Sequence, residues 1–179
     1  MGSFMSSALR ATVLCLIFAF ISGCATTANV ADGAKVGPKQ GLLVFKVTTA
    51  FQLSQLQYRK FSTNSSFGYF FAEEITGPDG AFVNKAGDTY WVKPVKAGDY
   101  MWSKLLVDQR FAIFHGTNRF TIKPNTITYV GHLVIEERNG SAHIGVQDNE
   151  QDIRAYLERN FPVDLRAMKF EKSITDFRL

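Results

Sequence analysis

TITYVGHLVIEERNGSAHIGV, residues 126–146, decides the fold, because one strong turn signal, Asn139-Gly140, lies between two runs rich in apolar side chains. Asparagine and glycine tolerate the positive φ that both central residues of a type I′ turn require. A two-residue loop sets the register of its flanking strands, so Ile135 should face Ile144. The sequence therefore predicts a long β-hairpin.

Alternation of side chains along the two strands separates one face of the hairpin from the other. The apolar face holds Leu133, Ile135, Ile144 and Val146. The opposite face holds His132, Val134, Glu136, His143 and Gly145. We expect the first face to be buried in the core.

Outward from the hairpin, short β-rich runs and turn signals alternate about every ten residues from Gly41 onward. The predicted strands are 41–49, 67–75, 89–95, 99–107, 110–114, 119–122, 126–137 and 141–146. Turns with Gly or Pro are predicted at 77–80, 96–99 and 123–125. Ring side chains share faces at period two: Phe67, Tyr69 and Phe71 on one strand, Tyr100 and Trp102 on another. This rhythm predicts a mainly β protein, a small antiparallel β-sandwich, rather than βαβ units.

One short helix is predicted near the C-terminus, where Asp148 or Asn149 can cap its first turn. Three apolar side chains share a helical face at i, i+3 and i+4: Ile153, Tyr156 and Leu157. Pro162 should end this helix. For residues 165–179 the pattern leaves a strand and irregular structure both open.

The composition fits one folded domain and gives no sign of a nucleic-acid partner. Hydrophobic residues make up 46% of the chain and aromatic residues 13%, which is ample for a core. The net charge of +4 comes from 20 basic and 16 acidic residues, and the basic ones are scattered rather than gathered into a stripe. No motif for a phosphate or dinucleotide cofactor is present, so no cofactor is predicted.

Residues 1–23 have the layout of an export signal. A polar start with one positive charge, Arg10, precedes an apolar run over residues 11–21. As a helix this run would span about 16 Å, roughly half of a hydrocarbon core, so it predicts a removed signal rather than a stable membrane span. Removal leaves 156 residues, the size of one domain, which we place at residues 41–179.

Ile21-Ser22-Gly23-Cys24, directly after the apolar run, resembles the lipobox of bacterial lipoproteins. The resemblance implies cleavage before Cys24 and transfer of a diacylglyceryl group to its thiol, with two or three acyl chains that hold the protein on a membrane. Aspartate after that cysteine retains enterobacterial lipoproteins in the inner membrane; Ala25 stands there and implies the outer membrane, facing the periplasm. The alternative is an ordinary secretory signal cleaved elsewhere, for instance after Ala25 or Ala28.

Cysteine usage supports an exported domain held by its core alone. Cys15 lies inside the signal, so the mature chain has one thiol and no disulfide. Residues 24–40 are small and polar and show no apolar period, which predicts a flexible tether with a reach of roughly 20 to 25 Å.

Two segments resemble a recurring theme of small periplasmic β-sandwiches: PVKAGDY at 94–100 and FTIKPNTITYVG at 120–131. The shared order is Gly-x-Tyr after a turn, then a strand, then a turn that leads to Tyr-Val-Gly. These segments are similar to transthyretin-like (carboxypeptidase regulatory-like) domains and to lipoproteins akin to them. The resemblance implies a non-catalytic β-sandwich.

The histidines bear on whether a metal or general-base site is possible. The hairpin register puts His132 opposite Gln147, four residues from His143, which separates the two rings by about 13 Å. That distance is too great for one zinc ion, so no metal site is predicted. His143 opposite Glu136 is interpreted as a cross-strand surface pair rather than a catalytic dyad. His115 is the third histidine.

Two further features could serve a site. Glu73-Glu74 could cleave a sugar only with a partner carboxyl about 5 to 9.5 Å away, and the sequence places none, so the pair is interpreted as a solvated strand end. The aromatic runs 58–61 and 67–71 could line a groove for a sugar or peptide, although most of their rings are expected in the core. Phe70, opposite in phase to its neighbours, would form a contact surface if exposed.

Two functions remain open at this point. The favoured one is a membrane-anchored cell-envelope lipoprotein whose sandwich, without catalysis, binds or organises another envelope protein or a cell-wall polymer. The alternative is a hydrolase acting on envelope sugars or peptides. A concave pocket with two or more convergent ionisable groups would favour the enzyme.

Overall fold

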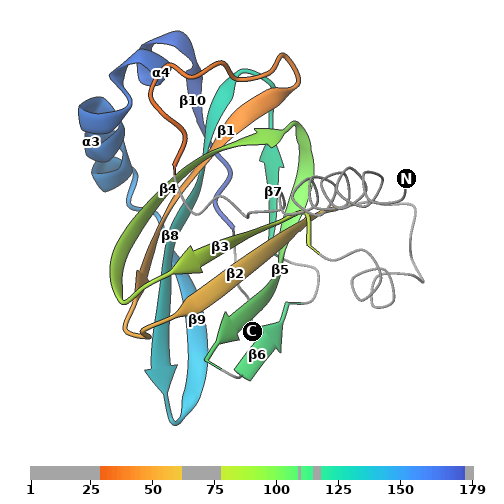
Figure 1. Ribbon diagram of the computed structural model, residues 1–179, viewed down its shortest axis with the longest axis vertical. Helices are drawn as coiled ribbons and strands as arrows, with labels where there is room; N and C mark the ends of the chain where they lie inside the picture. The colour runs from red at the N-terminus through yellow and green to blue at the C-terminus, as the bar shows by residue number, and fades with distance from the viewer. Residues whose placement is uncertain (1–28, 62–77, 109, 115–117, 176–179) are drawn as a thin grey trace, which may run out of the picture.

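The computed structural model describes residues 29–61, 78–108, 110–114 and 118–175, which form two facing β-sheets and two short helices (Figure 1). The first sheet contains β1 (Gln40–Thr49), β4 (Gly87–Lys96), β8 (Thr126–Arg138), β9 (Ser141–Gln147) and β10 (Lys169–Lys172). The second contains β2 (Ser54–Lys60), β3 (Gly80–Asn84), β5 (Gly98–Val107), β6 (Arg110–Ile113) and β7 (Arg119–Ile122). The helices, α3 (Glu150–Asn160) and α4 (Pro162–Ala167), lie outside the first sheet. The predicted mainly β sandwich is confirmed.

The strand pairing is antiparallel throughout the second sheet and mixed in the first. The orders are β10-β8-β1-β4, with β9 also paired to β8, and β3-β2-β5-β6, with β7 also paired to β5. β8 runs parallel to both β1 and β10. Parallel neighbours need a long crossover, and between β8 and β10 it consists of β9, α3 and α4.

Seven predicted strands are confirmed, as β1, β4, β5, β6, β7, β8 and β9. The predicted strand over residues 67–75 lies outside the described residues. The sequence did not indicate β2 and β3, because β2 alternates weakly among polar side chains and β3 has only five residues. Within residues 165–179, for which the sequence left a strand and irregular structure open, β10 is a strand.

The β8–β9 hairpin has the predicted turn and register. Asn139 and Gly140 have φ values of 52° and 75°, as a type I′ turn requires. Ile135 pairs with Ile144. The predicted core face lies in or against the core between the sheets: Leu133, Ile135, Ile144 and Val146.

Buried side chains form two cores, one on each face of the first sheet. β1 supplies both, because successive side chains point to opposite faces. The side chains on one face of β1 lie between the sheets with Tyr100 and Trp102; they are Leu43, Phe45 and Val47. The side chains on the other face of β1 lie beneath the helices; they are Leu42 and Val44. A strand buried on both faces accounts for the uninterrupted apolar run at the start of β1.

α3 begins at the predicted cap, where the Asn149 side chain accepts the Asp152 N–H at 3.4 Å. Its apolar face packs on the core beneath the helices: Ile153, Tyr156 and Leu157. The helix ends at Asn160, and Pro162 is the first residue of α4 rather than the end of all helical structure. Proline suits that position because a first-turn N–H has no intrahelical partner to lose. Within the described chain, no helix has the length and apolar character needed to cross a membrane.

Two of the predicted turns carry the chain from one sheet to the other. The turn at 96–99 links β4 to β5, with Gly98 at φ 152°. The turn at 123–125 links β7 to β8, with Asn125 at φ 53°. Both lie at the end of the sandwich where β1 begins, because Lys96 pairs with Gln40. Of the predicted turn at 77–80, the first residue lies outside the described part of the chain.

The sequence predicts a flexible tether over residues 24–40, and residues 29–39 of it lie against the domain. The Val30 N–H donates to the carbonyl of Val92 on β4 at 3.1 Å. The Asp32 carboxylate accepts two backbone N–H groups from the first turn of α4. An edge strand and a helix start both leave backbone groups unpaired, and this polar segment satisfies them. The first five residues of the predicted tether lie outside the described residues.

Candidate functional site

Several residues singled out from the sequence lie outside the described residues. They include the lipidation motif Ile21, Ser22, Gly23 and Cys24, the acidic pair Glu73 and Glu74, the aromatic run 67–71 with Phe70, and His115. The described residues do include the aromatic run 58–61 and the two hairpin histidines. The structure shows the contacts of the aromatic run and the strand pairing of the two histidines.

The rings of the run 58–61 are used in packing. Tyr58 stacks on Phe82 with ring centroids 5.4 Å apart, and burial raises the pKa of the Tyr58 hydroxyl to about 12. Phe61 lies against the Arg119 guanidinium, whose carbon is 3.6 Å from the ring centroid. These contacts account for the rings without a sugar or a peptide.

The hairpin histidines are arranged as the register predicts. His132 pairs with Gln147 and His143 with Glu136. The described residues contain no group of three side chains able to hold a metal ion. A depression of about 370 Å³ lies over this ribbon, and Glu136 is the one carboxylate among the described residues that line it. Sugar cleavage requires two carboxyls, and the described lining of the depression offers one, which forms an ion pair with Arg138.

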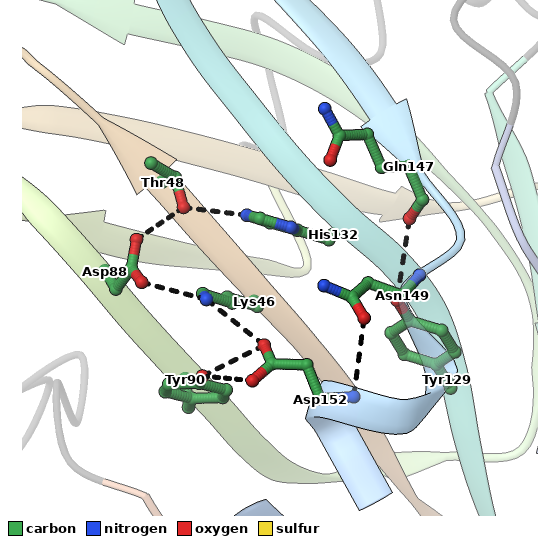
Figure 2. Close-up of polar contacts among 9 residues, drawn as sticks. All are labelled: Lys46, Thr48, Asp88, Tyr90, Tyr129, His132, Gln147, Asn149 and Asp152. Atoms are coloured by element: carbon green, nitrogen blue, oxygen red, sulfur yellow. Dashed lines mark hydrogen bonds and ion pairs between the residues drawn. The ribbon is translucent and has the colours of Figure 1, made fainter.

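A polar cluster around the buried Lys46 lies between the first sheet and the start of α3 (Figure 2). We call it the Lys46 cluster; it consists of Lys46, Thr48, Asp88, Tyr90, His132 and Asp152. It joins two carboxylates, a lysine, a tyrosine and a histidine in one connected set of contacts, and it is therefore the place to look for chemistry.

Strand pairing brings the members of the cluster together. Lys46 and Thr48 share the face of β1 that looks toward the helices. On one side, β4 places Tyr90 opposite Lys46 and Asp88 opposite Thr48. On the other side, β8 places His132 opposite Lys46. The first turn of α3 then covers this face of the sheet.

Lys46 is the centre of the cluster and is only 9% exposed. Its Nζ lies 2.8 Å from Asp88 and 3.1 Å from Asp152, and 5.0 Å from the centroid of the Tyr90 ring. The Tyr90 hydroxyl donates to the Asp152 carboxylate, 3.0 Å from each oxygen. The Tyr90 ring stacks on Tyr156 with centroids 4.1 Å apart. A buried cation requires such partners, and here they tie β1 to β4 and α3.

Hydrogen bonding fixes the state of His132. The Thr48 hydroxyl donates to Asp88 at 2.5 Å, because a carboxylate can only accept. The same hydroxyl oxygen lies 2.7 Å from His132 Nε2, which must therefore donate. Nε2 therefore carries a proton, and burial, then the charge of Lys46, lowers the pKa of His132, which favours the neutral ring with Nδ1 unprotonated. Its Nδ1 is buried and has no hydrogen-bond partner among the described residues.

The electrostatics of the cluster oppose catalysis. Burial disfavours the charge on Lys46, but hydrogen bonds with Asp88, Asp152 and Tyr90 outweigh burial and raise the pKa of Lys46. The bond to Lys46, then the bond to Thr48, lowers the pKa of Asp88. A protonated lysine is not a nucleophile, and a histidine whose Nδ1 faces no carboxylate lacks the orienting group of a triad. The arrangement acts as a clamp between strands and helix.

Sequence reasoning missed this cluster, although one signal was present. Lys46 is the single charge in the apolar run GLLVFKV at 41–47, and a charge in a strand buried on both faces needs a partner. The partners could not be named, because Asp152 is 106 residues away and meets Lys46 only through packing of α3.

Comparisons with known proteins give little further information. No protein-family model and no curated protein matches the chain. Among solved structures, the chain is similar to a crystal structure of the T6SS lipoprotein TssJ1 from Pseudomonas aeruginosa. The match has a TM-score of 0.29 and 12% sequence identity, and it covers 62% of this chain and 98% of that chain. A likeness at this level supports no inference about function, and the transthyretin-like resemblance stays a prediction.

Proposed function

We propose that the chain is a membrane-anchored lipoprotein of the cell envelope, acylated at Cys24, whose β-sandwich is a non-catalytic binding or structural module. The observation that carries the proposal is the segment Ile21-Ser22-Gly23-Cys24 directly after a short apolar run. Two or three acyl chains on one residue hold a protein on a bilayer, whereas a single chain gives only marginal binding.

Two observations support a non-catalytic role for the domain. The Lys46 ammonium and the carboxylates of Asp88 and Asp152 satisfy one another and hold α3 on the sheet. The nitrogen that has no partner among the described residues, His132 Nδ1, is buried. The ring side chains of β2 and β5 are used in the core. A partner would then be another envelope protein or a cell-wall polymer, and Ala25 after the acylated cysteine favours the outer membrane.

The mass of the mature protein purified from membranes tests this proposal. We expect a mass equal to the chain from Cys24 plus a diacylglyceryl group, with or without a further acyl chain. The protein should incorporate labelled fatty acid and stay with membranes during a high-salt wash, because its attachment is hydrophobic rather than electrostatic.

A matched pair of variants makes the test specific, since the chain has two cysteines. Cys24→Ala should abolish incorporation of the fatty acid. Cys15→Ala, which changes the cysteine inside the signal, should be acylated like the wild type. A wild-type mass equal to the bare polypeptide from any start site would contradict the proposal.

A further inference from the structure

An open groove of about 620 Å³ lies at the end of the sandwich where β1 begins and β4 ends. The segment before β1 and the two turns between the sheets form its walls, with Pro38, Ala97 and Pro124. Three lysines surround it: Lys39, Lys60 and Lys96. We call it the lysine groove. Its walls are largely apolar and its rim is basic.

The three lysines make no ion pair with any other described residue. Lysines elsewhere, such as Lys46 and Lys172, do pair with carboxylates. The acids on the adjoining turns serve other donors: Asp79 accepts the backbone N–H of Lys60, and Asp99 accepts the Thr121 hydroxyl. The groove therefore has three lysine ammonium groups that form no ion pair with a described residue, which suits an anion attached to an apolar body.

The N-terminal segment restricts which end of the domain can face a membrane. Asn29 is held at the middle of β4 by two hydrogen bonds to the strand backbone, each 2.9 Å long. Five Cα–Cα steps join it to Cys24, so the acylated residue lies within about 18 Å of Asn29. Lys96 lies four residues beyond Val92, about 13 Å along the strand. The hairpin turn at Asn139 lies roughly 30 Å away in the other direction, beyond that reach.

We propose that the lysine groove lies against the membrane that holds Cys24 and binds the phosphate headgroups of anionic phospholipids. The proposal rests on acylation of Cys24. The lysine ammonium groups bind the phosphates as point charges, while their carbon chains and the proline walls lie at the level of the headgroups. The opposite end of the sandwich, with the β8–β9 hairpin, then points away from the bilayer and is free to meet a partner.

The test uses the mature acylated protein in vesicles of phosphatidylcholine alone or mixed with phosphatidylglycerol. Its only native cysteine carries lipid, so one introduced thiol can be labelled uniquely with a fluorophore. Ala97→Cys places the label in the groove, and Ser141→Cys places it at the hairpin. Quenching by a lipid with a nitroxide on its headgroup reports how often each label is at the membrane surface.

We expect strong quenching at position 97 and little at position 141, with the difference largest in phosphatidylglycerol vesicles and reduced by high salt. Each of three single substitutions in the groove should lower the ratio of quenched to unquenched label at position 97 by about fivefold. They are Lys39→Gln, Lys60→Gln and Lys96→Gln. The control removes three cations far from the groove, by Lys85→Gln, Lys104→Gln and Arg138→Gln, and should leave the ratio unchanged.

Three outcomes are distinguishable. Equal quenching at the two labels, or equal effects of the groove and control variants, would overturn the inference while leaving the anchor intact. Quenching at position 97 that is unaffected by phosphatidylglycerol would show that the anchor alone orients the domain and would overturn the headgroup site. A bare-polypeptide mass for the same sample would instead refute the acylation on which the inference rests.

Discussion

At the scale of single residues, Gly131 determines which core receives the buried side chains from each half of β8. Tyr129 contributes to the core beneath the helices, and Leu133, four residues later, to the core between the sheets. Strict alternation would put both on one face, so one extra residue must be accommodated between them. Gly131 has φ 114° and stands where the pairing of β8 with β1 shifts. The bulge lets a single strand present apolar side chains to two different layers.

Gly131→Ala should therefore destabilise the domain by about 2 to 4 kcal/mol. A side chain at this φ is strained, and its Cβ would lie 2.5 Å from the Val146 side chain. Gly145→Ala is the matched control, because no atom lies within 4 Å of a Cβ built there. It should change the free energy of unfolding by no more than about 0.5 kcal/mol. Urea denaturation of both variants gives the comparison, and equal losses would argue against the bulge.

His132 should make the stability of the domain depend on pH. Burial, and then the charge of Lys46, lowers the pKa of His132 below its ordinary value of 6.5. Below pH 6.5 the unfolded chain therefore binds a proton that the folded chain refuses. The contribution of neutral His132 is complete above pH 6.5 and is lost as the pH falls toward the lowered pKa, by at most about 1.4 kcal/mol per pH unit.

Denaturation curves between pH 7 and pH 5 measure this slope. His132→Gln should flatten it, because the titrating group is gone. His143→Gln, on the same face of the ribbon but outside the Lys46 cluster, should keep the wild-type slope. If both variants behaved alike, His132 would not be the group that couples folding to protons in this range.

At the scale of elements, the β8–β9 hairpin determines the pairing of its own strands and one wall of the core. Ile135 is 1% exposed, whereas its neighbour Glu136 points to the outer face and pairs with Arg138. Ile135→Asp should unfold the domain or cost more than about 4 kcal/mol, because it buries an unpaired charge. Glu136→Ala should be nearly neutral, since an exposed ion pair contributes little.

Thermal melts of the two hairpin variants decide the register directly. A large fall in Tm for Ile135→Asp with little change for Glu136→Ala is the expected pair of results. Equal falls in Tm would mean that the two side chains are buried alike and that the pairing set by the turn is wrong.

Local signals explain which elements could be predicted from the sequence. The hairpin, α3 and the long strands have turn residues, caps and apolar periods within a few neighbouring positions. β2 and α4 lack these signals. β2 is held by its partners β3 and β5 rather than by its own composition, and α4 begins at a proline that also reads as a stop. Their formation depends on packing between segments far apart in the chain, and the spacing of apolar residues in the sequence does not reveal such packing.

At the scale of the whole molecule, the described chain has three layers: the second sheet, the first sheet and the helices (Figure 1). The sequence predicted the first two layers and a helix, but not that the helices cover a second core. The candidate site was hidden for the same reason. Lys46 needs β4 on one side and α3 above it, and neither neighbour is near it in the sequence.

The segment before β1 is an integral part of this assembly, and its removal gives the last prediction. A chain that begins at Gly41 loses the hydrogen bonds of Asn29 and Val30 with β4 and the contacts of Asp32 with α4. It also exposes apolar surface that Val36 covers in the core beneath the helices. Since a hydrogen bond contributes about 1 kcal/mol and a helix cap about as much, the chain should lose roughly 3 to 5 kcal/mol of stability.

Urea denaturation of three otherwise identical chains, beginning at Ala25, Asn29 and Gly41, makes the measurement. The chain from Asn29 keeps every described contact and should match the chain from Ala25 within about 0.5 kcal/mol, while the chain from Gly41 should have a clearly lower midpoint. Equal midpoints for all three would support a flexible tether over residues 24–40. A loss confined to the Gly41 chain would show that the domain begins close to Cys24, and that any anchor there holds it within a few residues of the membrane.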